Sequence, residues 1–364
     1  MHITRLELRQ FRNYEEAELR PCEGITVLYG NNAQGKTALL EAIVLACTGR
    51  SHRTSRDREL IRWGQEAGRV FVQAEKRDGS HEVEMLLSSL RRKIVKVNGG
   101  VLQRTGELMG HVNGVLFAPE DLRMVKDGPA ERRRFIDMEL SQIKPSYYYA
   151  LQHYAHALMQ RNRLLRDVAE KPAFADTLED WDAQLARCGA AIMRERQAFI
   201  ALISDSAHEN HLEISGGQED LKARYVPSLD TQDDEPAQAL MKALRVARNM
   251  DIRRGTTSVG PHRDDLMLTL SGMDVRVYGS QGQQRTTALS LKLAELDIMR
   301  REIGEWPVLM LDDVMSELDP KRRRQLLKRL DGIQTIVTCT DMSDLADAEI
   351  GAAWRIHNGT IASE

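Results

Sequence analysis

The sequence has few cysteines, and those it has are scattered. Its four cysteines, Cys22, Cys47, Cys188 and Cys339, show neither the spacing of a metal site nor the framework of a disulfide-rich domain. No apolar run approaches the length of a membrane span, and the first residues do not form a signal peptide. The formal net charge of −3 argues against a uniformly basic nucleic-acid binder. We therefore expect a reduced, cytoplasmic protein with no membrane segment.

Glycine and proline become rare between about residues 131 and 254, where apolar residues recur at helical spacing. Two apolar stripes separated by Pro172 predict an antiparallel helical hairpin roughly 40 Å long at 1.5 Å per residue. The polar segment 232–235 predicts a loop within this region. Short strand-like runs and helices occupy both flanks. The predicted fold class is α/β, with an N-terminal head part (1–130), an inserted mainly α-helical arm (131–254) and a C-terminal head part (255–364).

A phosphate-binding loop is predicted at residues 30–37, between a strand-like run at 25–29 and a helical pattern. The segment matches G-x-x-x-x-G-K-[ST] at every fixed position. In such a loop, backbone N–H groups point at phosphate oxygens, and glycines permit the close approach. Lys36 is expected to neutralise the β and γ phosphates, and the Thr37 hydroxyl to ligate Mg²⁺. The predicted nucleotide-binding residues are Gly30, Asn31, Asn32, Ala33, Gln34, Gly35, Lys36 and Thr37.

Two acids follow an apolar run at 308–311, at the carboxyl end of a predicted buried strand. Ligands of open α/β sheets bind at that end. Asp312 is predicted to hold the metal's water shell, and Asp313 to orient the attacking water or accept its proton. With Lys36, Asp313 forms the predicted catalytic pair. The alternative is a strand that simply ends in solvated acids.

A third motif, Ser280-Gln281-Gly282-Gln283-Gln284-Arg285, precedes a helical pattern, and Ser316-Glu317-Leu318-Asp319 follows the acidic strand. A serine and a glycine at a helix start are suited to gripping a γ-phosphate. Together with the phosphate loop, these motifs resemble the ATPase heads of the ABC/SMC class, in which two heads sandwich two ATP molecules. The resemblance implies that Ser280, Gly282 and Gln283 contact ATP held by the phosphate loop of a second copy.

Four further stretches narrow the resemblance to the RecF family of bacterial DNA replication and repair proteins, over essentially the whole chain. They are Ile3-Thr4-Arg5-Leu6-Glu7-Leu8, Phe11-Arg12-Asn13-Tyr14, Phe117-Ala118-Pro119-Glu120-Asp121-Leu122 and Gly260-Pro261-His262-Arg263-Asp264-Asp265. The resemblance implies an ATP-dependent homodimer that clamps gapped or duplex DNA at single-strand–double-strand junctions. It also implies ATP and Mg²⁺ as cofactors, and RecO and RecR as partners in loading RecA.

The same resemblance predicts a weak ATPase in which ATP is a switch for DNA binding. Asp313 stands where most ABC ATPases carry a glutamate, Thr340 where a histidine is usual, and Ala118 nearest to the usual glutamine. Two other functions stay open: the ATPase subunit of a transporter, and an ATP-binding protein scaffold that does not hydrolyse ATP. DNA-stimulated phosphate release would separate the three.

Two basic segments are candidates for DNA contact. One follows the phosphate-loop helix and the other lies near residue 92; the candidate residues are Arg50, Arg53, Arg56, Arg91, Arg92 and Lys93. No aromatic platform interleaves with them, which favours the duplex backbone over single-strand stacking. The alternative is a solvated charged face.

Overall fold

The computed structural model describes residues 1–229 and 235–363, so residues 232–234 of the expected polar loop lie outside the described part. The chain divides into two compact units. The first comprises Met1–Leu122, Glu209–Gln218 and Arg285–Glu364, and the second comprises Arg123–His208 and Glu219–Gln284. Among the described residues, no helix is long and apolar enough to cross a membrane.

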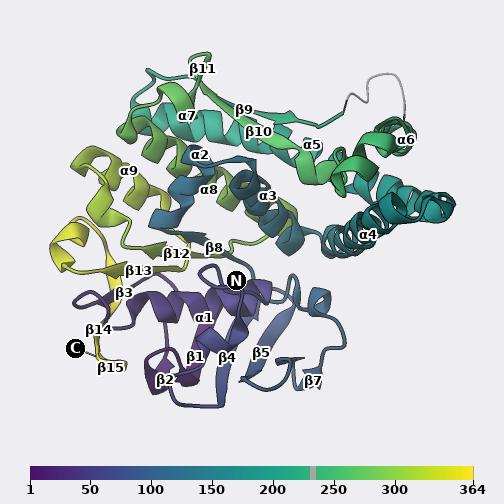
Figure 1. Cartoon of the computed structure of the whole chain (residues 1–364). Coiled ribbons are helices and arrows are strands. Elements are labelled where there is room, and N and C mark those ends of the chain that lie inside the picture. The colour runs from purple at the N-terminus through teal and green to yellow at the C-terminus, as the bar shows by residue number, and fades with distance from the viewer. Residues whose placement is uncertain (230–234, 364) are drawn as a thin grey trace. The chain divides into compact units, whose positions relative to one another are not determined.

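The first unit contains two six-stranded sheets with helix α1 (Lys36–Thr48) packed against both (Figure 1). One sheet is antiparallel, in the order β2-β1-β4-β5-β6-β7; the other, β15-β14-β3-β13-β12-β8, is parallel except for its edge strand β15. The strands are β1 (His2–Phe11), β2 (Tyr14–Leu19), β3 (Ile25–Tyr29), β4 (Ala67–Lys76), β5 (Gly79–Ser88), β6 (Ile94–Val97), β7 (Gly100–Val101), β8 (Gly114–Phe117), β12 (Val308–Asp312), β13 (Thr335–Cys339), β14 (Ile350–His357) and β15 (Thr360–Ser363).

Helix α1 forms the centre of this unit's core. Its sequence is rich in alanine and leucine, which favour helix, and it ends at Gly49 in the left-handed conformation that terminates many helices. Leu39, Leu40 and Ile43 are fully buried between the sheets. Strand β3 is buried along most of its length, as expected for a central strand of a parallel sheet covered on both faces. The core therefore fixes the turn between β3 and α1.

Other helical segments belong to the first unit or contain a boundary between the two units along the sequence. Short 3-10 turns are η1 (Asp57–Leu60), η2 (Thr105–Leu108), η3 (Pro119–Asp121), η6 (Met315–Glu317) and η7 (Met342–Leu345). Helix α9 spans Pro320–Arg329, α2 spans Leu122–Lys126, and α8 spans Gln281–Ile303. Because α8 begins at Gln281, Ser280 stands directly before a helix, as the sequence predicts.

The second unit is mainly helical. Its elements are α3 (Pro129–Ile143), α4 (Pro145–Glu170), η4 (Pro172–Thr177), most of α5 (Leu178–Ser215), α6 (Pro236–Arg254), η5 (Pro261–Arg263) and α7 (Val275–Tyr278), with a small antiparallel sheet of β9 (Leu221–Val226), β10 (Asp265–Leu270) and β11 (Met273–Asp274). Helices α4 and α5 form the predicted antiparallel hairpin, since Lys144 contacts Glu195 near one end and Arg161 contacts Asp182 toward the other. At 26 residues, α4 is roughly 39 Å long.

Strand β9 was not predicted. Its first four residues alternate between buried and exposed positions, with Leu221 and Ala223 buried, but the strand lies in a stretch whose surroundings are helical. The strand pairs along its whole length with β10, from Leu221 opposite Leu270 to Val226 opposite Asp265. The predicted domain boundaries at 130/131 and 254/255 stay a prediction.

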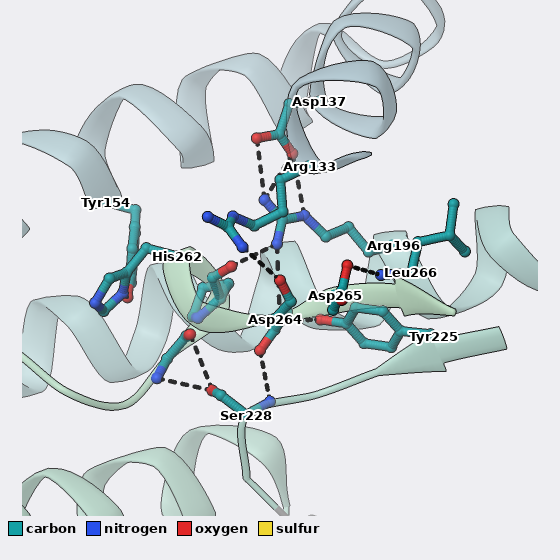
Figure 2. A network of polar contacts seen from close by, with 12 residues as sticks. Arg133, Asp137, Tyr154, Arg196, Tyr225, Ser228, His262, Asp264, Asp265 and Leu266 are labelled. Atoms are coloured by element: carbon teal, nitrogen blue, oxygen red, sulfur yellow. Dashed lines mark hydrogen bonds and ion pairs between the residues drawn. The ribbon is translucent and has the colours of Figure 1, made fainter. Parts of the chain in front are cut away.

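The Gly260–Asp265 motif is held by a polar network inside the second unit (Figure 2). Arg196 forms an ion pair with Asp137 and donates to the Pro261 carbonyl at 2.6 Å. The Asp264 carboxylate accepts the Ser228 N–H at 2.7 Å and also the Tyr225 hydroxyl. These bonds fix the turn that precedes β10.

His262 is a structural member of this network. Its Nε2 lies 3.1 Å from the Thr257 carbonyl, which can only accept, so Nδ1 accepts from the Tyr154 hydroxyl at 2.7 Å. Burial lowers the pKa of His262 to about 4, and the bond to Thr257 opposes that shift. His262 is therefore neutral near pH 7, with both ring nitrogens engaged.

Candidate nucleotide site

The phosphate loop joins β3 to α1, and its two fixed glycines are required by the backbone. Gly30 has φ +145° and Gly35 has φ +118°, values that residues with side chains rarely adopt. A Cβ at Gly30 would lie 2.4 Å from the Ile356 carbonyl oxygen, and one at Gly35 would lie 2.8 Å from the Tyr14 hydroxyl. The loop is thus shaped by neighbouring strands as well as by any ligand.

Lys36 is buried at the base of the loop, at 7% exposure. Its ammonium donates to the carbonyl oxygens of Gly30 and, at 2.9 Å, of Asn31. Burial lowers its pKa, while the nearby Asp313 and Asp312 act in the opposite direction. Lys36 is a desolvated cation held by two neutral acceptors, which is the state expected of a group that binds an anion.

Asp312 ends β12 at the loop, beside Thr37 from the start of α1. The Thr37 hydroxyl donates to Asp312 Oδ1 at 3.0 Å, and the Thr338 hydroxyl donates to the same oxygen at 2.7 Å. Burial raises the pKa of Asp312 in spite of these two bonds. The structure therefore brings together the two predicted metal-binding residues, which are 275 positions apart in the sequence.

Asp313 has an unusual backbone conformation for a residue with a side chain, φ +53°. Its N–H donates to Thr338 Oγ1 at 2.9 Å, and its carbonyl accepts the Ser316 hydroxyl at 2.8 Å. Such strain persists only where surrounding contacts impose it, and it concentrates at functional sites. Thr338 thus fixes both acids, by donating to Asp312 and accepting from Asp313.

A cavity of about 1120 Å³ opens over these groups. Loop residues 32–37 line it together with both acids and Thr338, all from the first unit. Its rim continues along the arginine-rich segment that follows α1, through Arg53, Arg58 and Trp63. The cavity therefore joins the predicted phosphate site to the first of the two predicted DNA-contact segments.

A buried carboxylate ties this rim to the phosphate-loop helix. Glu41 of α1 is fully buried, accepts two bonds from the Arg12 guanidinium at 2.6 and 2.7 Å, and also accepts the Ser51 hydroxyl. Arg12 donates in addition to the Glu59 carbonyl at 2.8 Å. Next to Arg12, Asn13 donates to the Gln34 carbonyl of the loop at 2.8 Å. One hub thus positions the loop and the rim together.

The two basic segments predicted for DNA contact lie side by side. Lys93 donates to both carboxylate oxygens of Asp57 at 3.0 Å, which joins the 91–93 segment to η1. Arg50, Arg91 and Arg92 are exposed, as are the side chains of Arg53 (45%) and Arg56 (66%). Arg53 lines the cavity and lies 4.0 Å from Glu41.

The remaining predicted residues, Ser280, Gly282 and Gln283, belong to the second unit. Ser280 and Gln283 cap the start of α8 reciprocally: Gln283 Oε1 accepts the Ser280 N–H at 2.8 Å, and Ser280 Oγ accepts the Gln283 N–H at 3.2 Å. The Gln283 amide also donates to Glu219 at 2.9 Å. The motif is thus a preformed helix start.

Thr338 and Glu41 also belong to the candidate nucleotide site, although no role was predicted for them from the sequence. Thr338 is a buried hydroxyl in an apolar strand, and Glu41 is a buried acid in an apolar helix. Each is a polar residue inside an apolar run, and that is the signal that could have revealed it. For Arg12 and Asn13, the sequence indicates only that they belong to a family motif.

The fold and this cavity define a class of ATPase heads. A family model described as the RecF/RecN/SMC N terminal domain matches residues 2–360. The chain is also similar to a solved Smc head domain from Pyrococcus furiosus, with a TM-score of 0.59 and 18% identity over 100% of this chain and 96% of that one. That likeness concerns the fold alone, and it agrees with the predicted fold class.

Relatives at higher identity narrow the class. The "DNA replication and repair protein RecF" of Acetivibrio thermocellus is 43% identical over 94% of both chains, and that of Lachnospira eligens is 41% identical over the full length of both. The solved "recombination mediator protein RecF-ATPrS in RecFOR pathway" has a TM-score of 0.93 and 38% identity, covering 100% of this chain and 98% of that one. The chain therefore belongs to the RecF family of DNA replication and repair proteins, which confirms both the predicted family and the predicted fold class.

Proposed function

We propose that this chain binds ATP with Mg²⁺, dimerises around it, and in that state clamps DNA. The observation that carries the proposal is the hydrogen bond between Thr37 and Asp312, because it brings the phosphate loop and the strand-end acid into one site. Solved relatives described as RecF-ATPrS and RecF-ATP support ATP as the nucleotide. Residues 30–37 would bind its phosphates, with Lys36 opposite their charge.

The residues fit Mg²⁺. Thr37 and Asp312 lie together and offer the hydroxyl and carboxylate oxygens that this ion prefers. A bound Mg²⁺ would neutralise charge on the phosphates. Asp313 would orient water and accept its proton, held in place through Thr338 and Ser316. A weak ATPase activity would then time the release of DNA.

For DNA, we propose the continuous basic surface of Arg50, Arg53, Arg56, Arg91, Arg92 and Lys93. Its arginines are exposed, and it borders the nucleotide cavity through Arg53. Such a surface suits phosphate backbones and gives salt-dependent binding. Membership of the RecF family supports gapped or duplex DNA as the target, and RecO and RecR as partners in loading RecA.

Each nucleotide site would be shared between two chains, with Ser280, Gly282 and Gln283 of one protomer completing the phosphate loop of the other. The test mixes two defective chains, Ser280→Arg and Lys36→Met. A mixed dimer keeps one complete site, formed by the loop of the first chain and the signature of the second. One of the two sites in a mixed dimer is intact, so part of the wild-type ATPase activity should return in the mixture. Normal ATPase activity and dimerisation by Ser280→Arg alone would contradict the shared site.

The two alternative functions are tested by phosphate release with and without DNA. Stimulation by gapped or duplex DNA supports the clamp. A turnover that ignores DNA but responds to a membrane partner would support a transporter subunit. ATP binding with no turnover under any condition would support a scaffold.

A further inference from the structure

Exposed apolar side chains stand beside both halves of the proposed shared site. Trp63, on the rim of the phosphate-loop cavity, is 97% exposed. Tyr278 and Val277, just before the Ser280 motif, are 68% and 59% exposed. We call the last two the signature patch. Single exposed apolar residues are ordinary, but an aromatic residue beside each half of one site suggests that both are covered when the site forms.

The signature patch is rigidly attached to Ser280. It lies on α7, whose Val275 and Arg276 carbonyls accept bonds from the Gln284 amide at 3.2 and 3.4 Å. Between the patch and Ser280 stands Gly279, where a Cβ would lie 2.5 Å from the Val275 carbonyl oxygen. The turn thus admits only glycine without rearrangement, and the patch moves together with the start of α8.

Trp63 is attached as firmly to the phosphate loop. The preceding residue, Arg62, donates its N–H to the Gln10 carbonyl at 2.9 Å, and Arg12 donates its N–H to the Leu60 carbonyl at 2.7 Å. These bonds hold the segment before Trp63 against the end of β1. Arg12 in turn is held by the Glu41 hub on the phosphate-loop helix. The tryptophan ring is therefore exposed because of where its backbone is fixed, not because its segment is loose.

We propose that Tyr278 and Val277 of one protomer pack against Trp63 of a second copy of this chain in the ATP-bound dimer. The inference rests on the proposed shared site. Tyr278 is two residues from Ser280, so at most roughly 7 Å of backbone separates them. If Ser280 reaches a phosphate in the partner's loop, Tyr278 must therefore lie at or near the rim of the partner's cavity. Trp63 lines that rim. Twofold symmetry would form the contact twice, once at each nucleotide.

The test measures dimerisation and nucleotide binding separately. Dimer dissociation constants are measured by analytical ultracentrifugation with ATP and Mg²⁺ in an Asp313→Asn background, where we expect hydrolysis to be slow. Trp63→Ala and Tyr278→Ala should each raise the dissociation constant about tenfold or more, as central aromatic residues do at interfaces. Matched controls are Met159→Ala on α4 (60% exposed) and Val246→Ala on α6 (82% exposed), which should leave it unchanged.

The double variant, Trp63→Ala with Tyr278→Ala, tests the contact itself. If the rings touch, the two losses overlap, and the double variant weakens dimerisation by clearly less than the product of the single effects. If the effects multiply, the two residues do not meet and the inference is wrong.

A second explanation for an effect of Trp63→Ala is that Trp63 stacks on the base of ATP in its own chain. The ATP affinity of the monomer, measured in a Ser280→Arg background, tests this alternative. Trp63→Ala should leave this affinity within about twofold, since the contact is between chains. A large loss would show that Trp63 stacks on the nucleotide base, which overturns the inference but leaves the shared site intact. If the Asp313→Asn chain does not dimerise with ATP at all, the shared site itself fails.

Discussion

Both units bury charged side chains, but the charges at the candidate nucleotide site of the first unit differ from those inside the second unit. In the second unit, Arg161 is fully buried and bonds to two fully buried carboxylates, Asp182 at 2.6 Å and Asp251 at 2.8 Å. In the first unit, buried Lys36 bonds to carbonyl oxygens, and buried Asp312 bonds to hydroxyls. One set of charges is neutralised by the fold. The hydrogen-bond partners of the other set, carbonyl and hydroxyl groups, carry no opposite charge.

The difference separates structural charges from functional ones. A buried ion pair contributes to a unique packing, and breaking it leaves a charge with no compensation. A buried charge without a counter-charge is unfavourable in the free protein, so it indicates where a ligand of opposite charge is expected. By this criterion the first unit is built to receive an anion at Lys36 and a cation at Asp312.

Replacing Arg161 with methionine should destabilise the free protein by about 3–5 kcal/mol, because Asp251 would remain buried without a cation and Asp182 would keep only Arg248. Urea unfolding measures the change. Arg56→Met is the matched control: Arg56 is 66% exposed beside Glu59, and its loss should cost less than about 0.5 kcal/mol. Equal losses of unfolding free energy for the two substitutions would show that the buried ion pairs of Arg161 contribute no more to stability than an exposed pair.

Lys36→Met should give the opposite pattern. Removing a desolvated cation should leave the stability of the free protein unchanged or slightly higher. It should weaken ATP binding about 100-fold or more, because charge-assisted bonds to phosphate are lost. Isothermal titration with ATP and Mg²⁺, together with unfolding of the free protein, checks both parts. An unchanged ATP affinity would show that the phosphate loop is wrongly assigned.

The Asp313→Asn variant should bind ATP but hydrolyse it at a rate reduced by about 100-fold or more, since an amide cannot accept the proton of the attacking water. ATP-bound dimers should accumulate, and DNA should be retained longer. Phosphate release and gel shifts on gapped DNA measure the two effects. Turnover at the wild-type rate would assign the proton acceptor to another group.

The smallest effect concerns acid stability and His262. Its pKa in the folded protein is about 4, below the ordinary 6.5, so the unfolded chain binds the extra proton first as pH falls. The contribution of His262 is complete above pH 6.5 and is lost as pH falls toward 4. Between pH 7 and 5 the loss amounts to about 2 kcal/mol.

His262→Gln keeps an amide donor toward Thr257 but does not titrate. Its stability should therefore depend less on pH than that of the wild type over the same interval. The measured quantity is the difference between the two unfolding curves at each pH, which cancels other titrating groups such as Asp121. Burial raises the pKa of Asp121 to about 6, and its contribution has the opposite sign. Parallel curves for the two proteins would contradict a buried neutral His262.

Local chemistry made much of the nucleotide site predictable. The phosphate loop, Asp312 and the helix start at Ser280 are each recognisable within a few residues, because glycine, lysine and strand-end acids have few other uses in those contexts. The roles assigned to Asp313 and to the basic segments stay predictions. The helical hairpin was also predictable, since its apolar spacing extends over many turns.

What the sequence could not predict depends on register between distant segments. Thr338 meets Asp312 only because β12 and β13 pair in parallel with these two residues opposite each other. In the sequence, Glu41 is a single acid in an apolar helix. Its role is apparent only in the structure, where Arg12 at the end of β1 forms an ion pair with it. Strand β9 has only six residues, too few to stand out in a helical stretch, and its partner begins 39 residues after it ends.

The position of β3 has a consequence for how the protein is made. This strand carries the phosphate loop and is among the first to be synthesised, yet it pairs on both sides with β13 and β14 from the end of the chain. At about 5–20 residues per second, the ribosome needs roughly 15–60 s to make the chain that separates them. Throughout that time both edges of an apolar strand lack their native partners. A nascent chain therefore has the phosphate loop long before it has a site for ATP, and nucleotide can stabilise only the finished protein.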